Sequence, residues 1–117
     1  MWGSDAPTTV LPFEDKTTGT PAQVLASRAG EACDLMKAMA HEGRLVILAL
    51  LAERERSVTE IEHALSLRQP AVSQQLARLR ADDLVAARRE GKVIYYSLAS
   101  DHVREMIATL GRMFDQA

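Results

Sequence analysis

The sequence predicts a mainly helical fold that carries one β-hairpin. Its 117 residues include six Gly and four Pro, which leaves long stretches free of backbone breakers. Two Phe, two Tyr and one Trp are few for a β-sandwich or barrel. The hairpin is predicted by residues 84–98, where β-branched and aromatic residues flank a glycine turn.

Length and composition are typical of one globular domain. Hydrophobic residues make up 47% of the chain and charged residues 26%, which excludes collagen-like, wholly disordered and disulfide-scaffold classes. We expect a flexible tail over residues 1–20 and a domain over residues 21–117. The single cysteine cannot form an internal disulfide. The apolar stretch Leu45 to Ala52 falls far short of the ~20 residues of a membrane span, and no signal-peptide pattern is present, so we expect a cytoplasmic protein without membrane contact.

Two helices are predicted before residue 54. Residues 22–40 contain no proline and repeat apolar residues every three or four positions, at Leu25, Ala29, Ala32, Leu35 or Met36, and Met39. The segment His41-Glu42-Gly43 interrupts this pattern. A largely buried second helix, ending near Glu53, is then predicted by Leu45, Ile47, Leu48 and Leu51.

A shorter helix is predicted from Ser57 to about Leu65. Ser57 and Glu60 match a capping box, because the serine oxygen can accept a hydrogen bond from a backbone N–H while Glu60 reaches back to the serine amide. The side chains expected to be buried on this helix are Val58, Ile61 and Leu65.

A fourth helix is predicted after a tight connection over residues 66–68. Pro70 is tolerated in its first turn, where the missing N–H would have no partner. The buried stripe of this helix is Val72, Leu76 and Leu79. This stripe turns four polar side chains to other faces: Gln69, Ser73, Gln74 and Arg78.

The hairpin and a last helix complete the predicted order of elements. The hairpin turns at Glu90-Gly91-Lys92. Ser100 or Asp101 can cap a helix that runs to about Asp115. The apolar stripe of that helix is Val103, Met106 or Ile107, Leu110 and Phe114.

This order of elements is typical of a helix-turn-helix followed by a wing. Residues 68–92 carry six basic and three acidic side chains, a net charge of +3, whereas the rest of the chain has a net charge of −5. A solvated amphipathic helix beside a surface hairpin would explain the charge but not the order of the elements. Amide and hydroxyl side chains can pair with base edges, and arginines with guanine or phosphate. The sequence therefore predicts binding to double-stranded DNA.

The candidate DNA-binding residues lie around the fourth helix and on the hairpin. We expect the helix to enter the major groove, with Gln69, Ser73 and Gln74 as base readers. Arg78 is either a reader or a phosphate clamp, and Pro70 and Ala71 can meet a thymine methyl group. The residues expected to hold phosphates or a minor-groove edge are Arg68, Arg88, Arg89 and Lys92.

Three segments resemble the ArsR/SmtB family of bacterial winged-helix repressors. They are residues 38–48 (AMAHEGRLVIL), 68–80 (RQPAVSQQLARLR) and 88–96 (RREGKVIYY). The resemblance extends over about residues 22–115. It implies a homodimer, built on the first and last helices, that binds a palindromic operator and is released by an inducer. Arg68 stands where the family often has serine, so the helix cap there is expected to be weaker.

The dimer implied by the resemblance agrees with the apolar residues of the outer helices. These residues are too many for the outer helices of a small monomer. The expected interface contains Leu25, Met36, Met39, Met106, Leu110, Met113 and Phe114.

The family's known metal sites do not match this sequence. The cysteine-rich site at the start of the third helix has no counterpart, because residues 59–65 contain no cysteine. The zinc-type positions on the last helix hold Ser100, His102, Met113 and Gln116. One imidazole does not make a four-coordinate site, so no metal and no cofactor are predicted.

The amino-acid sequence of residues 44–51 and 73–96 most resembles the family branch that senses reactive sulfur species or oxidants through two cysteines. The positions that match those cysteines hold Ala49 and Asp115, so the dithiol is absent. Derepression by a reactive sulfur or redox signal is thus implied for relatives of this branch. Cys33 lies elsewhere, on the first helix, and we expect a small buried apolar residue there, with a reactive thiol as the alternative.

No enzyme class fits the motifs. The chain has no glycine-rich phosphate loop and no HExxH pair, and His41, His63 and His102 fall on three separate segments. The alternative to a DNA-binding repressor is a winged-helix module for protein contact or for sensing a small ligand such as haem. The polar outer face expected for the fourth helix favours DNA.

Overall fold

The structure is a computed structural model that describes residues 19–66 and 69–115. Almost all of the tail expected over residues 1–20 lies outside the described residues. The chain divides into two compact units at residues 36 and 37, which are described separately. Within the described residues no helix has the length and apolar character that crossing a membrane requires.

The first unit contains α1 (Pro21–Ser27) and most of α2 (Ala29–Met39). A capping box starts α1: the Thr20 hydroxyl accepts from the Gln23 amide, and the Gln23 side chain accepts from the Thr20 amide. The prediction of a single helix over residues 22–40 is wrong at Arg28. There φ is −130° and ψ is 29°, so α1 ends and α2 begins after it. The Ser27 hydroxyl bonds to the Val24 carbonyl here, a local side-chain contact that competes with the regular helical ladder.

The second unit is built around α3 (Glu42–Glu53). This helix begins earlier than expected, because the His41 ring nitrogen Nδ1 caps it by accepting from the Gly43 amide. Two helices follow, α4 (Val58–Leu65) and α5 (Gln69–Ala81), and α3 packs against both. The core consists of Met39, Ile47, Leu48, Leu51, Ile61, Val72, Leu76, Leu79, Leu84, Val85 and Val103.

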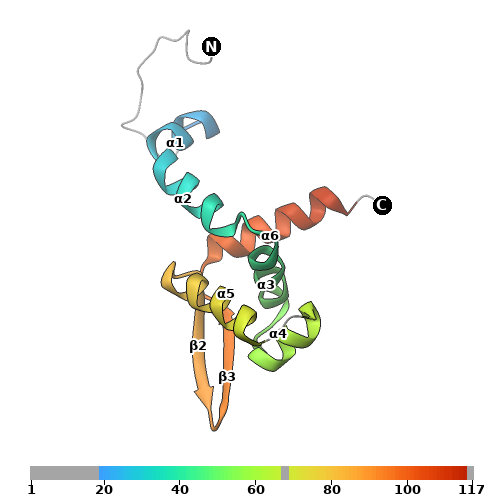
Figure 1. The fold of residues 1–117 in the computed structure, drawn as a ribbon. Coiled ribbons are helices and arrows are strands. Elements are labelled where there is room, and N and C mark those ends of the chain that lie inside the picture. The colour runs from blue at the N-terminus through green and yellow to red at the C-terminus, as the bar shows by residue number, and fades with distance from the viewer. Residues whose placement is uncertain (1–18, 67–68, 116–117) are drawn as a thin grey trace. The chain divides into compact units, whose positions relative to one another are not determined.

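A three-stranded antiparallel sheet completes the second unit, and its hairpin is visible in Figure 1. Its strands are β1 (Arg56–Ser57), β2 (Val85–Glu90) and β3 (Val93–Leu98), in the order β1-β3-β2. The predicted hairpin is confirmed, and Gly91 at its turn has a φ of 65°, a left-handed conformation that glycine adopts without a Cβ penalty. The sequence did not predict β1, whose Ser57 lies opposite Tyr95.

The last helix, α6 (Asp101–Phe114), begins as expected, because the Ser100 hydroxyl accepts from the Val103 amide across 3.2 Å. Val103 is fully buried against α3, but Phe114 at the other end is 79% exposed. The single chain thus buries the start of the predicted apolar stripe and leaves its end exposed.

Candidate DNA interface

The helix-turn-helix consists of α4 and α5. The capping box predicted at Ser57 and Glu60 is present: Glu60 N donates to Ser57 Oγ across 3.1 Å, and Ser57 N donates to Glu60 Oε1 across 2.8 Å. The Ser57 amide, aided by Arg54, holds the pKa of Glu60 below its ordinary value of 4.5. At the other end of α4, Ser66 adopts a left-handed conformation with a φ of 56°, which ends the helix and redirects the chain.

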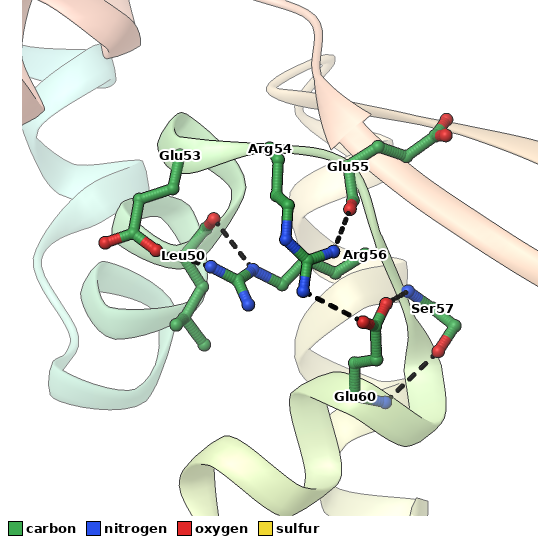
Figure 2. A network of polar contacts seen from close by, with 7 residues as sticks. All are labelled: Leu50, Glu53, Arg54, Glu55, Arg56, Ser57 and Glu60. Carbon is green, nitrogen blue, oxygen red and sulfur yellow. Dashed lines mark hydrogen bonds and ion pairs between the residues drawn. The ribbon is translucent and has the colours of Figure 1, made fainter.

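A polar network fixes the turn between α3 and α4 (Figure 2). Arg54 donates from Nη2 to Glu60 Oε2 and from Nη1 to the Glu55 carbonyl, each across 3.0 Å. Arg56 donates from Nε to the Leu50 carbonyl across 3.1 Å and also pairs with Glu53. These contacts join the end of α3 to the start of α4.

The helix α5 has an apolar inner face and a polar outer face. Val72, Leu76 and Leu79 are all 0% exposed, as the spacing predicted. Ser73, Gln74 and Arg78 consequently lie exposed on the opposite side of the helix, together with Ala71. Gln69 and Pro70 belong to α5, but their side chains lie outside the described part of the structure, as does Arg68.

An open groove lies along α5 and is lined by Arg44, Gln74, Gln75, Ala77, Arg78 and Ala81. Arg44 comes from the first turn of α3, and its Nε donates to Gln75 Oε1 across 3.2 Å. Its Nη1 donates to the Ala38 carbonyl across 3.2 Å. No local pattern predicts this contact, because Arg44 and Gln75 are separated by 31 positions.

The three basic residues predicted on the wing differ in their surroundings. Arg88 binds Glu55 through two hydrogen bonds of 2.8 Å each. This pairing lowers the pKa of Glu55 and raises the pKa of Arg88, in each case chiefly through the hydrogen bonds that join them. Arg89 and Lys92 are exposed, and the described residues form no ion pair with either.

The candidate sensing positions carry no thiol pair. Ala49 lies partly buried on α3, and Asp115 follows α6 as its C-cap. Cys33 on α2 is exposed, so its predicted burial is wrong for the single chain. His102 is exposed, and the described residues contain no cluster of three or more metal-ligating side chains.

A helix-turn-helix with a polar outer face, followed by a hairpin, defines the class: this chain is a winged helix-turn-helix transcriptional regulator. The family model described as "Bacterial regulatory protein, arsR family" matches residues 41–87. The chain is 44% identical over 95 residues to the transcriptional activator HlyU of Vibrio cholerae, covering 81% of this chain and 88% of that protein. It therefore belongs to the arsR family of bacterial regulatory proteins.

Further similarities support the same assignment. The biofilm growth-associated repressor of Agrobacterium fabrum is 43% identical over 94 residues, which cover 80% of each chain. The crystal structure of the transcriptional repressor BigR from Xylella fastidiosa matches with a TM-score of 0.78 and 34% identity, over 81% of this chain and 97% of that one. These relatives are DNA-binding regulators and not enzymes, as predicted for this chain.

Proposed function

We propose that this chain is a repressor that binds a palindromic operator as a homodimer. In this proposal α5 enters the major groove, and the wing follows the neighbouring backbone. The observation that carries the proposal is the division of α5 into two faces. Val72, Leu76 and Leu79 are fully buried, so Ser73, Gln74 and Arg78 are held with their side chains exposed on a fixed helix. Arg78 also lies in a long ion pair, with 3.9 Å between its Nε and Asp82 Oδ2.

Exposed apolar side chains support the homodimer. Leu25 is 55% exposed, Met36 50%, Met113 61% and Phe114 79%. The first two lie on helices of the first unit and the last two on α6 of the second unit. Large exposed apolar side chains on a helix are typical of a surface that a second copy covers. A two-fold symmetric dimer can also place its two recognition helices about 34 Å apart, the distance between successive major grooves on one side of DNA.

We propose repression, and not activation, from the names of the relatives. The proteins of Agrobacterium fabrum and Xylella fastidiosa are repressors, whereas HlyU of Vibrio cholerae is an activator. A dimer that occupies its operator can exclude other proteins from the same DNA, which is sufficient for repression.

The signal that releases the chain from DNA differs, in our proposal, from that of a two-cysteine sensor. Derepression by a reactive sulfur or redox signal is implied for relatives with two cysteines, and one solved relative is described as reduced HlyU from Vibrio cholerae. Ala49 and Asp115 supply no thiols here, and Cys33 is the single cysteine. An intramolecular disulfide therefore cannot switch this chain.

The experiment that tests the proposal starts with selection of bound duplexes from a random pool. The affinity of the selected duplex and of a random duplex is then measured by fluorescence anisotropy. Gln74→Ala should cost about 1 to 3 kcal/mol on the selected duplex and little on random DNA, because a base contact carries sequence information. Lys92→Gln is the matched contrast and should weaken both complexes, because a phosphate contact does not depend on sequence.

Two results would contradict this assignment. Equal losses on both duplexes for Gln74→Ala would show that Gln74 does not read bases. Failure of the selection to yield any preferred sequence would show that α5 does not recognise an operator.

A further inference from the structure

The side chain of Arg88 crosses the central strand of the sheet. Because β3 lies between β1 and β2, Ser57, Tyr95 and Arg88 occupy one row across the three strands. Arg88 extends from β2 over the Tyr95 ring, with 4.7 Å between the guanidinium carbon and the ring centroid. It ends on the carboxylate of Glu55, the residue just before β1. The wing is thus joined to the turn that precedes α4.

The donors of this guanidinium are already directed at protein partners. Nε donates to Glu55 Oε2 and Nη2 donates to Glu55 Oε1, both across 2.8 Å, and Nη1 lies 3.6 Å from Glu90 Oε1. Arginine binds a carboxylate and a phosphate through the same planar fork of two donors. A DNA phosphate could therefore use this fork only by displacing Glu55, whose negative charge would then remain beside the phosphate.

Glu55 is itself held in place by the network that starts α4. Its backbone oxygen accepts from Arg54, which also binds Glu60 of the capping box. Figure 2 shows the Glu55 carboxylate pointing away from the Arg54 guanidinium, which leaves it available for Arg88. The contact of Arg88 thus ends on a fixed part of the helix-turn-helix.

Arg89 and Lys92 differ from Arg88 in position and in partners. Successive side chains of a strand face opposite sides of the sheet, so Arg89 lies on the other face of β2, opposite Ile94. Lys92 lies in the turn itself. Both side chains are exposed, and neither forms an ion pair with a described residue.

We propose that Arg88 is a positioning residue, held by Glu55, that fixes the direction of the wing, and that Arg89 and Lys92 are the phosphate contacts of the wing. This inference differs from the expectation that all three residues hold phosphates. It rests on the proposed function, because it requires that the wing follow the DNA backbone.

The salt dependence of operator binding tests the two roles separately. Each phosphate that a protein neutralises contributes about 0.9 to the slope of log affinity against log salt concentration. Because a homodimer loses one contact from each of its two subunits, Arg89→Gln and Lys92→Gln should each flatten this slope by about 1.8. Arg88→Gln should leave the slope unchanged and lower operator affinity by a factor of about five at every salt concentration, the equivalent of about 1 kcal/mol.

A second readout separates positioning from general stability. Arg88→Gln should lower the ratio of operator affinity to random-DNA affinity, since a misdirected wing harms the specific complex most, whereas a mere loss of stability leaves this ratio unchanged. Arg88→Lys keeps the positive charge but loses the planar fork, so it should behave as Arg88→Gln does. Glu55→Gln combined with Arg88→Gln should lose no more operator affinity than Arg88→Gln alone.

The outcomes distinguish this inference from the proposed function. A slope flattened by about 1.8 in Arg88→Gln, or full operator affinity in Arg88→Lys, would overturn the positioning role and leave the proposed function standing. Additive losses in the double variant would also overturn it. Unchanged slopes in both Arg89→Gln and Lys92→Gln would show that the wing does not contact phosphates, and the inference would then fall together with the proposed role of the wing.

Discussion

Arg44 Nε at the start of α3 donates to Gln75 Oε1 on α5 across 3.2 Å. This hydrogen bond orients the side-chain amide of Gln75, the residue that follows Gln74. The same guanidinium reaches the Ala38 carbonyl near the end of α2, also across 3.2 Å. One side chain therefore joins the end of α2, the start of α3 and the middle of α5. Since Gln75 Oε1 faces Arg44, its NH₂ group is left for other partners.

A double-mutant cycle should detect this link. Arg44→Met and Gln75→Met each remove the hydrogen bond while keeping an unbranched side chain, so we expect a coupling free energy of about 1 kcal/mol in urea denaturation. The matched control pairs Arg44→Met with Gln74→Met, whose effects on the free energy of unfolding should add. Additive effects in the first cycle would show that the contact contributes nothing to stability.

The exposed end of α6 should be required for dimerisation. We expect the chain to sediment as a dimer at micromolar concentration and Phe114→Ser with Met113→Ser to shift it towards monomer, because the substitutions remove apolar area from the interface. Operator affinity should fall in parallel. Val93→Ser, which changes a 41% exposed residue of the wing, should leave the dimer intact. A monomeric parent chain in the presence of palindromic DNA would contradict this prediction.

The lowered pKa of Glu60 makes stability depend on pH. A carboxylate whose pKa is below 4.5 in the folded chain stabilises it above that value, and this stabilisation is lost as the pH falls through the folded-state pKa. We therefore expect Glu60→Gln to show a flatter decline in the free energy of unfolding than the parent chain between about pH 5 and pH 3.

Ser57→Ala is the matched control for that measurement. It removes the hydroxyl that caps α4 but keeps the backbone N–H that Glu60 accepts. The free energy of unfolding should fall by about 1 kcal/mol with little change in its pH dependence. Parallel pH curves for the parent chain and Glu60→Gln would rule out the proposed contribution of this carboxylate.

Oxidants should leave operator affinity nearly unchanged. One cysteine in each chain excludes an internal bridge, so organic persulfide or mild peroxide can modify only Cys33 or link the two copies of it in a dimer. Operator titrations of untreated and treated protein, with Cys33→Ser as the control, measure the effect. A tenfold or greater loss that disappears in Cys33→Ser would identify Cys33 as a sensor, for which its exposure in the single chain provides access.

Local patterns predicted the helix-turn-helix and the wing because each leaves a short-range signature. The spacing of Val72, Leu76 and Leu79 and the pair Ser57 and Glu60 are examples that the structure confirms. The two-residue strand β1 has no such signature, because its pairing with Tyr95 and Tyr96 is supplied by a segment almost forty residues further on.

Burial and pairing were harder to predict than the elements themselves. An apolar stripe indicates which face of a helix avoids water but not whether the same chain covers it. Cys33 was expected to be buried and is exposed in the single chain. The sequence shows that Arg88 is basic, but only the fold brings it to Glu55, 33 positions away. Long-range ion pairs of this kind decide which basic residues remain available to DNA.

The separation of packing and recognition on α5 has a consequence for how such regulators diversify. Val72, Leu76 and Leu79 hold the helix without assistance from Ser73, Gln74 or Arg78, so substitutions at the exposed positions leave the core untouched. Effects of surface and core changes that share no contacts are close to additive. Gene copies of one scaffold can thus acquire different target sites by point substitution, without first losing and then regaining the ability to fold.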